Sequence, residues 1–348
     1  MAEKRGWAEK EKLERVQAAL IGSFIGDAMG MPVEAWSAER IKKLNKGKGV
    51  SDFIEPKEMR TGWEGLHIGD ITDDTQLMSA VARSIIRCRG WNLTDCMNEY
   101  VYEFERSTFG WGSATVSAVR DYKEGRRIDL HQPPSYIKGR GAGNGALMVV
   151  APLALFEIIK QGKIEENDLA KKCMELAFLT HSDVQAGFAA YAGALVITRV
   201  INQPIRNTKE GKQLLPWLIN SVSKLEEKYR RENWPTDWND TVLTRLRLIP
   251  GVIKNTEAIR DQLGVEFHSR STVSFTIATF LRHPNDFRQG ILEAVNAGGD
   301  TDTQASIVGA MIGANSGLTS MPKEWIKFRP KYAEAFKLGK ALYGAANF

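Results

Sequence analysis

Apolar residues recur with the period of an α-helix along most of this chain. In residues 72–89, for example, Leu77, Val81 and Ile85 fall on one helical face. Residues 271–282 are apolar and partly β-branched, which fits a strand or a buried helix, and we favour a helix because helices surround them. No run of alternating strands is present, so the pattern predicts one all-α domain of close-packed helices. The other predicted helices lie at 9–30, 92–105, 113–123, 146–160, 166–178, 184–200, 287–297 and 304–315, with a last helical segment from Met321 to about Gly344.

Small residues are stacked at helical spacing in two of these segments. Glycine lowers helix propensity, so several glycines in register indicate that another backbone packs closely against that face. The stripes are Gly22, Gly26 and Gly30 in the first helix and Ala305, Gly309 and Gly313 in the helix at 304–315.

Three segments depart from the helical pattern. Residues 1–15 are dense in Lys, Glu and Arg and are read as a charged N-terminal extension of a domain spanning 16–348. Residues 38–63 are irregular and predict a long surface loop or a short helical flap, a kind of segment that is often functional. Residues 202–250 are the most polar part and predict peripheral, variable helices with little chemistry.

Composition narrows the class of protein. The chain has 348 residues, 43% hydrophobic and 26% charged, which is ordinary for a globular protein. The net charge of +5 is spread among nearly as many acids, so it does not indicate nucleic-acid binding. Cys88, Cys96 and Cys173 lack paired spacing, which argues against disulfides and zinc ribbons. Without a signal peptide or a sustained apolar run, we expect a cytoplasmic protein that does not enter membranes.

Two similar acidic clusters carry the chemistry. Asp300 and Asp302 flank Thr301 behind Gly298-Gly299, at the start of an uncharged helical run. Much earlier in the chain, the segment Thr72–Gln76 reads Thr-Asp-Asp-Thr-Gln and also begins an apolar helix. We expect the two clusters to meet in space and to hold divalent cations between them.

The reason is electrostatic. Clustered carboxylates raise one another's pKa and destabilise the fold unless a cation lies among them. All-oxygen ligands suit Mg²⁺ or Mn²⁺, Thr72 and Thr303 can add hydroxyl oxygens, and two clusters make a site for two metal ions natural. The competing interpretation is that each acidic turn merely caps its helix.

Other motifs are excluded or weaker. An EF-hand loop starting at Asp300 would need Gly and Glu where Ala305 and Met311 stand, and the chain lacks GxSxG, HExxH and paired CxxC motifs. Asp27, in the first apolar helix, is interpreted as a hydrogen-bonded buried group. The glycine-rich run 139–145 fits either a phosphate-binding loop or a plain turn. His181 alone is more often structural than catalytic, and Ser182 or Asp183 could cap the helix that follows.

Taken together, these residues resemble the ADP-ribosylglycohydrolase family, which includes the dinitrogenase reductase-activating glycohydrolases and the ADP-ribosylarginine and ADP-ribosylserine hydrolases. The resemblance covers residues 13–325 and depends on motifs in a fixed order. One departure is Val149, where many relatives carry Arg. The motifs are Gly22–Ala28 with Gly30, Pro32 and Glu34; Ile71–Thr75; Gly143–Ala146 with Met148, Ala151 and Pro152; Thr180-His181; and Asn296–Thr303.

The resemblance implies an orthogonally packed all-α domain with a binuclear Mg²⁺ or Mn²⁺ site. Glu34 would lie on a flap beside the metals. The ADP-ribose would contact the glycine-rich loop, at Gly141, Gly143 and Asn144, and His181. The implied metal ligands are Thr72, Asp73, Asp74, Asp300, Asp302 and Thr303.

The function implied is a hydrolase that removes ADP-ribose from protein side chains, with arginine as our preferred acceptor. The metals would hold the ribose hydroxyls and lower the pKa of a water nucleophile, and Asp302 or Glu34 would shuttle the proton. Free ADP-ribose would be the product. The alternative is an immunity-type protein that occludes an ADP-ribosyltransferase toxin, using residues 1–15 as a binding arm; those residues are otherwise a solvated helix end.

Overall fold

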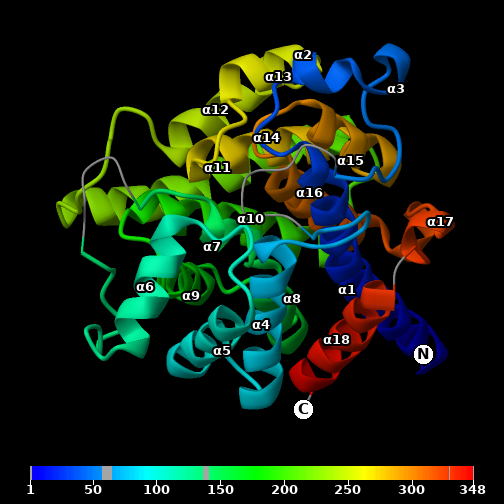
Figure 1. Cartoon of the computed structure of the whole chain (residues 1–348). Coiled ribbons are helices and arrows are strands. Elements are labelled where there is room, and N and C mark those ends of the chain that lie inside the picture. The colour runs from blue at the N-terminus through cyan, green and yellow to red at the C-terminus, as the bar shows by residue number, and fades with distance from the viewer. Residues whose placement is uncertain (1, 57–64, 136–140, 329, 348) are drawn as a thin grey trace.

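Helices account for all the regular structure in the residues that the computed structural model describes, which are 2–56, 65–135, 141–328 and 330–347 (Figure 1). No strand occurs in those residues, so the all-α prediction is confirmed. The α-helices of the first half are α1 Ala2–Gly30, α2 Ala38–Lys42, α3 Leu44–Gly47, α4 Asp73–Cys88, α5 Leu93–Arg106, α6 Ser113–Lys123, α7 Gly145–Met148, α8 Ala151–Gln161 and α9 Glu166–Phe178. Those of the second half are α10 Val184–Asn202, α11 Thr208–Arg231, α12 Val242–Val252, α13 Thr256–Leu263, α14 Ser269–Arg282, α15 Phe287–Asn296, α16 Thr301–Ser316, α17 Lys323–Ile326 and α18 Pro330–Ala346. Two 3₁₀ turns, η1 Met31–Val33 and η2 Leu318–Ser320, join them.

The centre of the fold is the antiparallel pair α1 and α16, whose small-residue stripes face each other. A Cβ atom added at Gly26 would lie 2.1 Å from the carbonyl oxygen of Ala305, and one at Gly22 would lie 2.3 Å from that of Gly309. Gly30 meets Thr301 in the same way. Only glycine allows the two backbones to come this close, which confirms the prediction from the stripes. The contact brings the end of α1 to the start of α16, where Asp302 lies.

Two predicted helices are each divided in the structure. The segment 146–160 forms α7 and α8 with a break at Val149 and Val150, because Pro152 has no N–H to donate to the carbonyl of Met148. The prediction of one continuous helix there is wrong. The C-terminal segment likewise forms α17 and then α18.

Side-chain caps fix several of the remaining boundaries. Asp183 caps α10 by accepting from Gln185 N at 2.9 Å, which decides between the two predicted caps. Asp286 caps α15 through Gln289 N at 3.1 Å. Residues 271–282 lie in α14, so the choice of helix over strand is confirmed.

The segments expected at the periphery are joined to the rest of the fold. Helix α1 runs through residue 15 without a break, and α18 packs beside it near the two chain ends (Figure 1). Residues 202–250 form α11 and α12 with the loop between them, and in that loop Thr236 Oγ1 donates to Asp183 Oδ1 at 2.7 Å. Residues 38–56 form the short helices α2 and α3 with the turns around them. Residues 57–63 of the predicted flap lie outside the described part.

By length and composition, two helices could cross a membrane, Glu9–Val33 and Val184–Asn202. The expectation that no segment is apolar enough for this is therefore wrong. In both, 94% of the most apolar window is buried inside the protein, as in core helices. Cys88, Cys96 and Cys173 are free thiols.

Candidate active site

The N-terminus of α4 is capped by a carboxylate from another helix. Asp27, on α1, accepts from Thr72 N at 3.0 and 3.1 Å and from Thr75 N at 3.2 Å. The hydroxyls of Thr72 and Thr75 donate to it at 2.9 and 2.6 Å. The Thr72 side chain makes no cap bond of its own. The interpretation of Asp27 as a hydrogen-bonded buried group is confirmed. Because Asp27 caps α4, the side chains of Asp73 and Asp74 in its first turn are not needed as caps.

The second acidic cluster is held by backbone bonds from two distant segments. Gly299 exchanges hydrogen bonds with the segment after η1, since Ala35 N donates to Gly299 O at 2.8 Å and Gly299 N donates to Trp36 O at 2.9 Å. On the other side, Asp300 N donates to Val265 O at 2.9 Å. Gly299 has φ +74°, and a Cβ atom there would lie 2.1 Å from Val265 O. The glycine thus lets the turn fit between the two segments, which places Glu34 beside the cluster.

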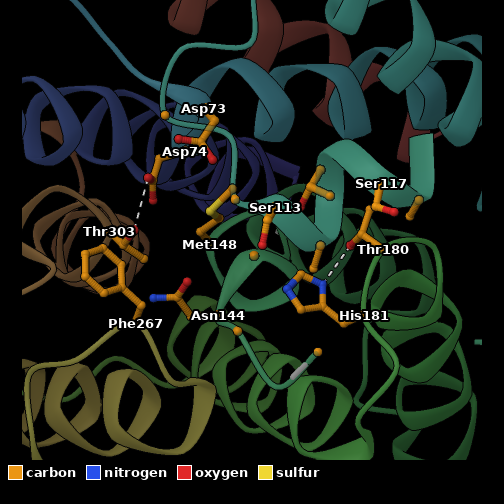
Figure 2. Close-up of a pocket in the computed structure, with 18 of the residues that line it drawn as sticks. Asp73, Asp74, Ser113, Ser117, Asn144, Met148, Thr180, His181, Phe267 and Thr303 are labelled. Atoms are coloured by element: carbon orange, nitrogen blue, oxygen red, sulfur yellow. Dashed lines mark hydrogen bonds between the residues drawn. The ribbon is translucent and has the colours of Figure 1, made fainter. Parts of the chain in front are cut away.

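The two clusters meet, as the sequence predicts. Thr303 Oγ1 donates to Asp74 Oδ2 at 3.1 Å (Figure 2). Asn144 Nδ2 donates to Asp300 Oδ2 and to Thr272 Oγ1. They lie in a cavity of about 800 Å³. It is lined by Glu34, Asp73, Asp74, Gly110, Gly112, Ser113, Ala114, Thr115, Ser117, Ala118, Asp121, Pro134, Ser135, Gly141, Gly143, Asn144, Gly145, Met148, Thr180, His181, Ser182, Phe267, Asp300, Asp302 and Thr303.

The carboxylates at the acidic end of this cavity are buried and close to one another, and both effects raise their pKa values. Burial raises the pKa of Asp302 well above its ordinary value, and the nearby charges of Glu34, Asp74 and Asp300 raise it further. Burial, and then the charge of Asp27, raise the pKa of Asp73 and of Asp74 in the same way. No Lys or Arg occurs among the described residues that line the cavity. The site therefore favours either protons or a bound cation.

The donor set fits a hard divalent cation. One oxygen each from Glu34, Asp300 and Asp302 lie within 4.8 Å of one another. Asp74 Oδ1 and Asp302 Oδ1 are buried, and neither has a hydrogen-bond partner among the described residues. Buried carboxylate oxygens without partners are costly, whereas Mg²⁺ and Mn²⁺ take oxygen ligands of this kind. Simple helix capping does not explain the cluster, because neither Thr72 nor Asp300 caps its own helix with a side chain.

His181 lies at the end of the cavity away from Asp73 and Asp74 (Figure 2), and the glycines of the loop line the cavity beside it. Gly141 O accepts from Asp183 N at 3.1 Å, so this part of the loop is fixed to the start of α10. A Cβ atom added at Gly143 or Gly145 would lie 3.1 or 2.8 Å from the His181 ring. The ring pairs with Thr180 Oγ1 at 2.7 Å, and burial lowers the pKa of His181 to about 4. His181 is therefore neutral at pH 7 and packs directly against the loop.

Every predicted site residue except Thr72 lines this cavity. Thr72 is buried and donates its hydroxyl proton to Asp27. Of the predicted glycine-rich run, Gly139 and Arg140 lie outside the described residues. Val149, the departure from the motif, is buried and does not line the cavity.

Several lining residues were missed by the sequence analysis. Ser113, Thr115 and Ser117 come from the first turns of α6, and Phe267 from the segment before α14. The polar turn before α6 is a weak local signal, and Phe267 has none, because its place depends on how α14 packs.

Comparisons with known proteins agree with this geometry. A model of the family described as ADP-ribosylglycohydrolase matches residues 8–347. The chain is 24% identical over 364 residues to the ADP-ribosylhydrolase ARH3 of Bos taurus, covering 97% of this chain and 94% of that protein. It is 26% identical over 328 residues to the uncharacterized protein YegU of Escherichia coli (strain K12), covering 89% and 90%. A solved structure described as an ADP-ribosylglycohydrolase-related protein complex matches with a TM-score of 0.64 and 26% identity, covering 97% of this chain and 99% of the other. The chain belongs to the ADP-ribosylglycohydrolase family.

Proposed function

We propose that this protein hydrolyses the bond between ADP-ribose and a modified protein side chain, and that the side chain is arginine. The observation that carries the hydrolase proposal is the meeting of the two acidic clusters at one end of a cavity of about 800 Å³. A cavity of this size suits a ligand as large as ADP-ribose. The family to which the chain belongs supplies the substrate class.

Two divalent cations, Mg²⁺ or Mn²⁺, would be held by oxygens of Asp73, Asp74, Asp300, Asp302 and Thr303, with Thr72 beside them. When bound, such ions polarise the substrate and lower the pKa of water. Asp74 Oδ1 and Asp302 Oδ1 support the proposal, because both are buried and lack a partner among the described residues.

The chain's own residues bind and orient the substrate. The loop at Gly141, Gly143 and Asn144 and the neutral ring of His181 form a wall for the ADP-ribosyl group. In the reaction, a water oxygen bonds to the anomeric carbon of the ribose and the bond from that carbon to the acceptor nitrogen breaks. A carboxylate of Asp302 or Glu34 takes the proton from water and returns it to that nitrogen. ADP-ribose and unmodified arginine leave.

The charge of the cavity supports arginine as the acceptor. A guanidinium group is cationic, and Glu34 and Asp121, the acidic lining residues that are not assigned to the cations, would attract it; the described lining contains no Lys or Arg. A serine leaving group is neutral and gains nothing from this field. The acidic lining residues are Glu34, Asp73, Asp74, Asp121, Asp300 and Asp302.

The acceptor is tested with two matched substrates, one protein ADP-ribosylated on arginine and one on serine. Each is incubated with the enzyme in Mg²⁺ or in EDTA, and released ADP-ribose is quantified. We expect Mg²⁺-dependent release from the arginine substrate. Release from the serine substrate alone would overturn the arginine assignment and leave the hydrolase standing. No metal-dependent release from either substrate would contradict the hydrolase itself.

A further inference from the structure

A second cavity, of about 340 Å³, lies between α9 and α11. Its described lining shares no residue with the cavity of about 800 Å³ that holds the acidic clusters, called the catalytic cavity below. Phe178, the last residue of α9, belongs to its wall, and His181 of the catalytic cavity follows three residues later. A volume near 340 Å³ falls within the range of small-molecule sites. The proposed hydrolase activity makes no use of this cavity.

One wall of the second cavity is aromatic. The Trp234 ring stacks on Phe178 with centroids 5.3 Å apart and planes 18° apart. Tyr229 lies against the same indole at 5.4 Å. All three residues line the cavity. Stacked aromatic faces of this kind favour a planar ring as the ligand.

The interior of the cavity contains a polar group without a partner. Ser221 is 2% exposed, and its Oγ atom has no hydrogen-bond partner in the described part of the chain. Leaving a buried hydroxyl without a hydrogen-bond partner destabilises the fold. Tyr191, which is also 2% exposed, lines the same interior. A ligand with polar atoms would supply the missing partner.

Of the three lysines that line the cavity, Lys171 lies 3.8 Å from Glu175, and the other two are more available. Lys224 and Lys228 are exposed, lie one turn apart on α11, and form no ion pair with any described residue. Two positive side chains at positions i and i+4 of a helix repel each other, and together they attract an anion.

The two acids of the lining are already engaged. Glu166 accepts from the indole N–H of Trp217 at 2.9 Å, and Glu175 accepts from that of Trp91 at 2.9 Å. Glu175 also lies 3.8 Å from Lys171. Three lysines (Lys171, Lys224 and Lys228) and two glutamates (Glu166 and Glu175) line the cavity, so its described lining has a net charge of +1.

We propose that this cavity is a second ligand site, for a small planar aromatic compound that carries an anionic group such as a phosphate. The ring would lie against Trp234 and Tyr229, the anion would face Lys224 and Lys228, and a polar atom would reach Ser221. The proposal is independent of the reaction at the catalytic cavity.

The test uses 1-naphthyl phosphate as the probe and ¹⁹F NMR of the full chain labelled with 5-fluorotryptophan. The Trp234 resonance is assigned as the one that is lost in Trp234→Phe. No ADP-ribose is added, because its adenine ring and phosphates match the proposed ligand class and would compete with the probe for the second cavity. We expect a saturable shift of the Trp234 resonance, and an affinity weakened about tenfold or more in the double variant Lys224→Glu/Lys228→Glu.

The matched control is Lys209→Glu/Lys254→Glu, which makes the same change of net charge at exposed lysines outside the cavity. This variant should bind the probe like the unaltered chain. 2-Naphthol, which has the ring without the anionic group, should bind more weakly than the phosphate. The proposal is overturned if the Trp234 resonance does not respond, or if both double variants bind the probe equally.

Discussion

Asp27 Oδ2 accepts a 2.6 Å hydrogen bond from the hydroxyl of Thr75, at the centre of a set of bonds that ties α1 to the first turn of α4. The same carboxylate takes the backbone N–H groups of Thr72 and Thr75. Asp27 therefore acts as the cap of α4 from outside that helix. Because Asp73 and Asp74 begin that helix, the position of half the acidic cluster depends on a residue that does not line the cavity.

Replacing Asp27 with Ala should leave two backbone N–H groups and two hydroxyls without their acceptor. We predict a loss of about 3–5 kcal/mol in the free energy of unfolding, measured by denaturant titration in Mg²⁺. Asp286→Ala is the control, since it removes a single cap bond at α15 and should cost about 1 kcal/mol. Equal losses in the two variants would show that the Asp27 cap is an ordinary one.

The close approach of α1 and α16 predicts an unusual intolerance of alanine. In Gly26→Ala the new Cβ would lie 2.1 Å from a backbone carbonyl oxygen that cannot rotate away. We expect the helices to separate and the unfolding free energy to fall by about 3 kcal/mol or more. Gly251→Ala, in α12, meets nothing within 4 Å and should be neutral or stabilising by up to about 1 kcal/mol. A Gly26→Ala protein as stable as Gly251→Ala would contradict the packing.

The glycine-rich loop predicts a variant that affects binding and leaves the metal site intact. Gly141 has φ +82°, and a Cβ atom there would lie 2.1 Å from Ser182 Oγ in the cavity wall. We predict that Gly141→Ala raises KM about tenfold, with Mg²⁺ affinity unchanged in calorimetry. Gly125→Ala has a similar φ of +73° and meets nothing within 4 Å, so it imposes the backbone strain alone. A matching rise of KM in Gly125→Ala would assign the effect to general strain.

The raised pKa values predict how Mg²⁺ and pH act together on stability. Without metal, the raised pKa of Asp73, Asp74 and Asp302 makes the folded state bind protons more tightly than the unfolded state. This contribution is present at low pH and is lost as pH rises through the raised values. Mg²⁺ replaces those protons, so the gain in Tm from Mg²⁺ over EDTA should be larger at pH 7.5 than at pH 5.5.

The titration of His181 changes the stability with pH in the opposite direction to that of the aspartates, so its effect must be separated from theirs. Burial lowers the pKa of His181 to about 4, so its contribution to stability falls as pH drops below about 6.5. The His181 contribution falls in the same way with and without Mg²⁺, so it cancels when the Tm in EDTA is subtracted from the Tm in Mg²⁺. In Asp302→Asn the pH-dependent gain should shrink. A gain from Mg²⁺ that is the same at both pH values would count against the cluster as the binding site.

Regular spacing and repeated motifs in the sequence predicted the close helix packing and the pairing of the two acidic clusters. The glycine stripe at Gly22, Gly26 and Gly30 has the spacing of one helical face, so close packing there follows from the chain alone. The near copies at Asp73 and Asp300 could be paired because their residue types match.

The features that the sequence did not predict arise from contacts between distant segments. Nothing local assigns the Asp27 carboxylate to Thr72 and Thr75, since any set of hydrogen-bond donors would satisfy a buried carboxylate. Asn144 reaches Asp300 only because the start of α7 and the start of α16 converge. The break before α8 was, by contrast, foreseeable from the missing N–H of Pro152.

The most direct test of the proposed function compares the unaltered enzyme with Asp302→Ala on an arginine-ADP-ribosylated protein, with Mg²⁺ titrated against EDTA. Circular dichroism checks that the Asp302→Ala variant folds like the unaltered enzyme. We predict that ADP-ribose release by the unaltered enzyme depends on Mg²⁺, and that kcat/KM falls at least about a hundredfold in Asp302→Ala. Release that persists in EDTA, or an Asp302→Ala enzyme as active as the unaltered one, would contradict the account.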